Sequence, residues 1–104
     1  MNRGFIRKEM KKQEDVKIGV AWHREDQWHF LRSTASDPET IEERYQDWLQ
    51  SAEKAIKLLN EQGFSPVKVD FDVKEFNDWC KRKGRAPDAE SRSIYVADLL
   101  RQRH

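Results

Sequence analysis

Two aspartates flank an aromatic residue at the end of an apolar segment, in the run Asp70-Phe71-Asp72. Paired carboxylates at the end of a buried strand could bind Mg²⁺ and form an aspartyl-phosphate. That chemistry also needs a lysine and further carboxylates from later strands, and only helices are predicted to follow. Glu75 lies three residues after Asp72, which is the spacing of a helix cap. We therefore expect Asp72 to cap a helix, and we predict no catalytic residues.

Potential metal ligands and a lone thiol are the next candidates for chemistry. Four potential ligands lie close together after a predicted strand: His23, Glu25, Asp26 and His29. The two histidines are six residues apart, which would place them on different faces of a helix, whereas paired ligands favour a spacing of four. We expect surface histidines and neither a metal site nor a cofactor. Cys80 lies on an apolar helix face and is predicted to be a small core residue.

The segment from 73 to 104 is predicted to be a basic helical hairpin, the outline of a helix-turn-helix DNA reader. Gly84 is predicted to end its first helix and Asp88 to cap its second. Its candidate nucleic-acid contacts are Lys81, Arg82, Lys83, Arg85 and Arg92. The start of its second helix carries Asp88 and Glu90, whose charge has the wrong sign for phosphate. A nucleic-acid-binding regulator is therefore the alternative function, behind a protein-interaction role.

Net charge does not favour a polyanion as partner. The chain has 104 residues with 20 Lys and Arg against 19 Asp and Glu. Residues 1–15, 16–72 and 73–104 carry +2, −4 and +3, which sum to +1. Without a uniform positive field, nonspecific binding to nucleic acid or to an anionic membrane is not expected. The single cysteine and the absence of a long apolar run predict a cytoplasmic protein with no membrane partner.

The elements that position these residues form one small domain. Residues 1–15 are predicted to be a flexible basic arm, and residues 16–104 a single α+β domain. Alternating apolar residues predict strands over 16–22 and 67–71. Residues 24–33 favour a short helix, although the second arm of a hairpin is an alternative. The expected order is β-α-α-β-α-α, predominantly helical, with a two-stranded sheet that is covered by helices and is parallel if the strands pair directly.

A long central helix over about residues 38–62 is the clearest prediction. Ser36, Asp37 and Pro38 form a helix-start signal, and Gly63 supplies a left-handed stop. Between them an apolar stripe occupies one face of the helix. The stripe consists of Ile41, Tyr45, Trp48, Leu49, Ala52, Ala55, Ile56 and Leu59.

Three residues are candidates for contact with a partner. We expect Trp28 to be partly exposed, while the other three tryptophans pack in the core. Leu58 lies outside the apolar stripe, either as a single exposed leucine or in a second apolar patch with Phe64 and Leu31. Because no catalytic group, phosphate loop or metal cluster is evident, we expect a small non-enzymatic protein that binds another protein, with a second copy of itself as one candidate partner. The expected binding surfaces are the exposed edges of the thin sheet and the long helix.

Overall fold

The computed structural model describes residues 16–103. Its order of elements confirms the predicted α+β, predominantly helical fold. The predicted arm over residues 1–15 lies outside the described residues. In chain order the elements are β1 (Lys17–His23), the 3₁₀ turn η1 (Glu25–Gln27), α2 (Trp28–Thr34), the 3₁₀ turn η2 (Pro38–Thr40), α3 (Tyr45–Glu61), β2 (Ser65–Phe71), α4 (Val73–Lys83) and α5 (Ala89–Gln102).

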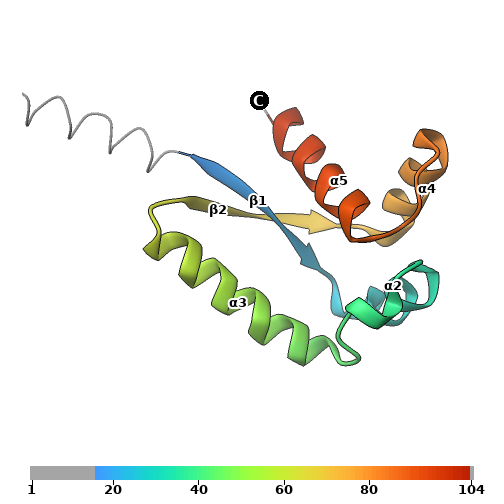
Figure 1. Ribbon diagram of the computed structural model, residues 1–104, viewed down its shortest axis with the longest axis horizontal. Coiled ribbons are helices and arrows are strands. Elements are labelled where there is room, and N and C mark those ends of the chain that lie inside the picture. Colours follow the sequence, from blue (N-terminus) through green and yellow to red (C-terminus); the bar gives the residue numbers. More distant parts are fainter. Residues whose placement is uncertain (1–15, 104) are drawn as a thin grey trace, which may run out of the picture.

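The two strands pair in parallel, as predicted, with Gly19 opposite Val67 and Ala21 opposite Val69. The chain returns from β1 to β2 through α2 and α3, a connection long enough for parallel pairing. Figure 1 shows both strands running between α3 on one side and α5 on the other. Helices therefore cover both faces of the sheet.

Close contact between β1 and α5 depends on a glycine. A Cβ atom at Gly19 would lie 2.9 Å from Cγ1 of Val96, whose side chain is buried. That separation is shorter than van der Waals contact, so the absence of a side chain at Gly19 lets α5 pack directly on the strand. On the same face, Val69 and Phe71 of β2 are almost fully buried.

The core lies between this sheet face, α2, α4 and α5, where aromatic rings dominate it. Phe71, Phe76, Trp79 and Tyr95 contact one another, with ring centroids 5.0 to 6.2 Å apart. The predicted apolar face of α4, including Cys80, is entirely buried. Because packing of such large rings supplies much of the stability of a small domain, this cluster fixes where α4 and α5 lie.

The long helix begins at Tyr45, so the predicted start at about residue 38 is wrong. Pro38–Thr40 forms only a 3₁₀ turn, and Ile41 is extended and buried in the core. The indole Nε1 of Trp28 donates to the carbonyl oxygens of Glu42 and Glu43, both at 3.2 Å. A helix running through this segment would use those carbonyls for its own hydrogen bonds. The tertiary contacts of Ile41 and Trp28 therefore override the local start signal.

The other predicted helix ends are confirmed. Asp72 accepts a hydrogen bond from the backbone N–H of Glu75 at 3.1 Å, and Asp88 accepts one from Ser91 at 2.9 Å. Gly63 and Gly84 have φ angles of 92° and 66°, the left-handed conformation that ends a helix at low cost. The short helix predicted over residues 24–33 forms as η1 and α2, so the hairpin alternative is wrong.

Candidate interaction surface

The predicted acidic pair meets a cation of its own chain. Arg24 donates to both carboxylate oxygens of Asp70, at 3.0 and 2.6 Å, and its guanidinium lies 3.4 Å from Asp72. The hydrogen bonds and charge of Arg24 lower the pKa of Asp70 despite some desolvation. Asp72 serves as the cap of α4, as predicted. One arginine thus pairs with both carboxylates at the end of β2. Over residues 16–103 no group of three or more His, Cys, Asp and Glu side chains has the geometry of a metal site.

His23 was expected on the surface, and that expectation is wrong. It is 8% exposed, and its ring lies 4.7 Å from that of Phe71 and 5.1 Å from that of Trp48, between ring centroids. Burial, together with the positive charge of Arg92, lowers the pKa of His23 to about 4. The side chain is on the polar face of the strand's alternation, but α5 covers that face too. The predicted exposure of His29 is confirmed.

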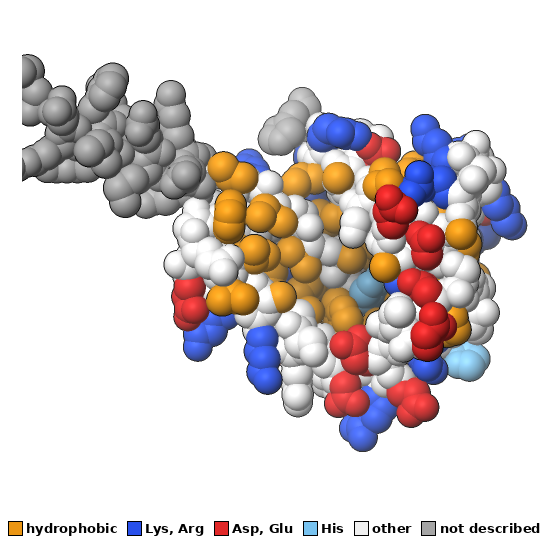
Figure 2. Space-filling model, viewed as in Figure 1, with side chains coloured by type: hydrophobic (Ala, Val, Ile, Leu, Met, Phe, Trp, Pro, Cys, Tyr) orange, Lys and Arg blue, Asp and Glu red, His pale blue; other side chains and the backbone are white. Residues whose placement is uncertain are grey.

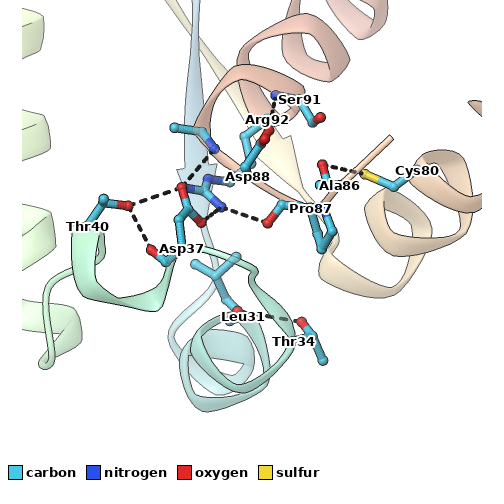
Figure 3. Close-up of polar contacts among 11 residues, drawn as sticks. Leu31, Thr34, Asp37, Thr40, Cys80, Ala86, Pro87, Asp88, Ser91 and Arg92 are labelled. Atoms are coloured by element: carbon cyan, nitrogen blue, oxygen red, sulfur yellow. Dashed lines mark hydrogen bonds and ion pairs between the residues drawn. The ribbon is translucent and has the colours of Figure 1, made fainter. Parts of the chain in front are cut away.

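Two arginines of the basic hairpin form polar contacts within the domain. Arg92, with 12% of its side chain exposed, lies 3.1 Å from Asp37, which also accepts from the backbone N–H of Ala89 (Figure 3). Arg85 donates to the hydroxyl of Ser91 at 3.0 Å. Of the five predicted nucleic-acid contacts, only the three consecutive cations at the end of α4 are exposed. These are Lys81, Arg82 and Lys83.

The predicted partner contacts are scattered rather than grouped. Trp28 is only 6% exposed, so its expected exposure is wrong, because its indole is needed to hold the segment before α3. Leu31 is 3% exposed and belongs to the core, so it does not extend a surface patch. Leu58 is 54% exposed and Phe64 is half-buried. Trp79 is buried as expected, whereas Trp22 and Trp48, also expected in the core, are half-buried, with ring centroids 5.3 Å apart.

The outer edge of β1 is one of the two sheet edges expected to bind a partner, but sequence reasoning did not distinguish it from the edge of β2. Within the described residues the sheet has only two strands, so each strand has one unpaired edge. Val16 O accepts from Ser65 N at 2.9 Å. In a parallel pair, the backbone N–H and C=O groups of alternate residues point toward the partner strand. Since Val16 points toward β2, the backbone groups of Gly19 and Ala21 point away from it. The backbone groups of Gly19 and Ala21 therefore form an open edge.

The two open edges differ in how they are protected. By the same alternation, the backbone groups of three β2 residues point to the outer edge of that strand, namely those of Pro66, Lys68 and Asp70. Proline lacks an N–H, and charged side chains discourage another strand, so this edge carries the usual safeguards against pairing. The outer edge of β1 has small residues instead, and no charged side chain lies between Lys17 and His23. Of the two edges in the described sheet, that of β1 lacks these safeguards from Ile18 to Trp22.

Apolar side chains surround this edge. Figure 2 shows hydrophobic side chains gathered between α3 and α5 around a hollow in the surface. The β1 residues on the α3 side, Ile18, Val20 and Trp22, are half-buried, and Val16 is 45% exposed. On the α5 side a depression of about 290 Å³ is lined by Gly19, Ala21, His23, Ala89, Arg92, Ser93 and Val96. We call the open backbone of β1 and these flanking side chains the β1-edge surface.

The fold and this surface define a small α+β domain with a thin parallel sheet and one unprotected strand edge. In residues 16–103 no helix combines the length and hydrophobicity that a bilayer crossing requires. The chain belongs to a family described as a domain of unknown function, DUF8829, whose model matches residues 5–104. No curated protein and no solved structure matches the chain.

Proposed function

We propose that this domain is a non-enzymatic protein-binding module that takes up a strand from its partner at the β1-edge surface. The single observation that supports this role is the open edge of β1, which has apolar flanks and, from Ile18 to Trp22, neither the proline nor the charged residues that protect β2. Strand addition derives its affinity from backbone hydrogen bonds and its specificity from alternate side chains. A cytoplasmic location is part of the same proposal.

The apolar flank of β1 supplies the second part of the binding energy. The side chains of Ile18, Val20 and Trp22 remain half-buried although α3 covers this face. A strand added beside β1 would bury their exposed parts, and burial of apolar area is favourable at roughly 25 cal/mol per Å². A partner segment is therefore expected to be extended, with apolar residues at alternate positions.

A displayed library of random peptides of about eight residues, the usual length of a strand, tests this proposal. The protein is immobilised sparsely, so that copies do not meet. We expect the enriched peptides to alternate apolar and polar residues. The enriched peptides should bind Val20→Lys, which places a charge beside the edge, roughly tenfold or more weakly than they bind the wild type.

Leu58→Lys is the matched control, because Leu58 is equally apolar and more exposed but belongs to α3 and not to β1. Its peptide binding should equal that of the wild type. Selection of peptides that bind the wild type and Val20→Lys equally well would contradict the proposal. So would a selection that Leu58→Lys alone abolishes, because that result would assign binding to α3.

A further inference from the structure

We infer that the partner at the β1-edge surface is a second copy of the chain, joined by antiparallel pairing of β1 with β1 about a twofold axis at Val20. This inference rests on the proposed strand-binding role and adds the identity and register of the partner. The result would be a four-stranded sheet with the order β2-β1-β1-β2. Two-stranded sheets gain much of their stability from such extension or from covering helices.

The backbone pattern of β1 is self-complementary in this register. With Val20 opposite Val20 of the second copy, Gly19 lies opposite Ala21 and Ala21 opposite Gly19. Both residues direct their N–H and C=O groups outward, so each of the two pairs exchanges two hydrogen bonds. The outward carbonyl of His23 already accepts from the hydroxyl of Tyr45 at 3.1 Å. Because the carbonyl of His23 is already engaged by Tyr45, the hydrogen bonds between the two β1 strands are limited to Gly19 and Ala21.

Charge favours a second copy over a charged partner. A twofold interface brings each residue near its own equivalent, so every charge at its centre would meet a like charge. The strand from Ile18 to Trp22 carries no charge. Arg92, the one cation lining the adjoining depression, is paired with Asp37. The centre of this surface is therefore neutral, and self-association has no repulsion to overcome there.

The α5 side provides room for the second helix. Strands in a sheet lie only about 4.8 Å apart, whereas packed helices need about 8 to 10 Å between axes, so α5 of each copy must approach closely. Ala89, Ser93 and Ala97 recur every four residues along α5, and all three are exposed. Ala89 and Ser93 line the depression beside β1. Small side chains in this row allow the two helices to pass without a clash.

The α3 side supplies the apolar contact. In the same register Ile18 lies opposite Trp22 of the second copy, and Val20 meets Val20. Nζ of Lys68 lies over the indole of Trp22, 4.3 Å from the ring centroid, an attractive cation–π contact. Cross-strand aliphatic and aromatic pairs of this kind stabilise antiparallel strands.

Sedimentation of the full chain across the micromolar range tests the association. The wild type and Leu58→Lys should sediment as a dimer of twice 12.5 kDa, that is, about 25 kDa. The dimer of Val20→Lys should dissociate at a protein concentration at least roughly tenfold higher than that at which the wild-type dimer dissociates. Circular dichroism shows whether the variant is folded. A wild type that is monomeric throughout would overturn the inference, and peptide binding that Val20→Lys abolishes would then leave the proposed strand-binding role standing.

Cysteine crosslinking tests the register and does not depend on the lysine variant. Mild oxidation should join Val20→Cys into a covalent dimer, because facing residues in a non-hydrogen-bonded antiparallel pair have Cα atoms about 4.5 Å apart, within disulfide range. Ile18→Cys should remain uncrosslinked, because its equivalent in the second copy lies four residues away along the strand. Cys80 is buried in all variants and gives the wild-type background. If the wild type is a dimer but Ile18→Cys crosslinks faster than Val20→Cys, the proposed pairing is overturned.

Discussion

Replacing Asp37 with alanine is expected to lower the free energy of unfolding by about 1 to 3 kcal/mol, the usual cost of leaving largely buried hydrogen-bond donors without their acceptor. Asp37 joins the segment before α3 to the first turn of α5. Its carboxylate accepts from Arg92 at 3.1 Å and from the backbone N–H of Ala89 at 2.9 Å, and its own side chain is only 16% exposed. Removing it leaves the guanidinium of Arg92 buried without a counter-charge (Figure 3).

Chemical denaturation of paired variants separates the ion pair from other effects. In an Arg92→Met background, Asp37→Ala should cost much less, because no unpaired cation remains. Asp98→Ala is the matched control, since Asp98 pairs with Arg101, whose side chain is 75% exposed. Exposed pairs of this type contribute about 0 to 1 kcal/mol. Equal losses for Asp37→Ala and Asp98→Ala would contradict the structural role assigned to Asp37.

Acidification between about pH 6.5 and pH 4 is expected to destabilise the domain through His23. Burial lowers the pKa of His23 from 6.5 to about 4, so over this range the unfolded chain binds the proton and the folded chain does not. The unfolded state binds more protons, and stability therefore falls as the pH falls through this window. A shift of this size corresponds to about 3 kcal/mol in total.

Thermal or urea unfolding measured across this pH range tests the prediction. His23→Phe should show a flatter pH dependence between pH 6.5 and 4, whereas His29→Gln, which alters an exposed histidine, should follow the wild type. The pKa values of Asp37, Asp70 and Asp88 are also lowered in the folded state. These carboxylates add a further loss of stability, mainly below pH 4. An unchanged slope in His23→Phe would show that another group is responsible.

Local signals in the sequence predicted most of the helix ends, because a cap or a stop forms through contacts between residues that are close in the sequence. The caps at Asp72 and Asp88 and the stops at Gly63 and Gly84 depend on a few neighbouring residues, and all four formed as expected. The start of α3 was mispredicted because it depends on a long-range contact. The indole of Trp28 binds two carbonyls that a helix starting at residue 38 would have used.

Prediction of the surface was weaker, since exposure depends on which elements cover each face. Alternation along β1 placed His23 on the outside, but α5 packs on that face through Gly19. The exposed sheet edges were expected to bind a partner, but the signal in the sequence that distinguishes the two edges was overlooked. The segment from Ile18 to Trp22 lacks charge and proline, whereas the other strand alternates Pro66, Lys68 and Asp70. Comparing the protection of the two strands would have identified β1 as the accessible one.

Amide hydrogen exchange at Gly19 and Ala21 is the most direct test of strand pairing at the β1 edge. Their N–H groups point away from β2, so in an isolated domain they should exchange much faster than those of Val20 and Trp22, which face β2. We predict that the amides of Gly19 and Ala21 become protected as the protein concentration rises, while that of Leu58 does not change. Rapid exchange at both residues at every concentration would contradict pairing of this edge with a second copy.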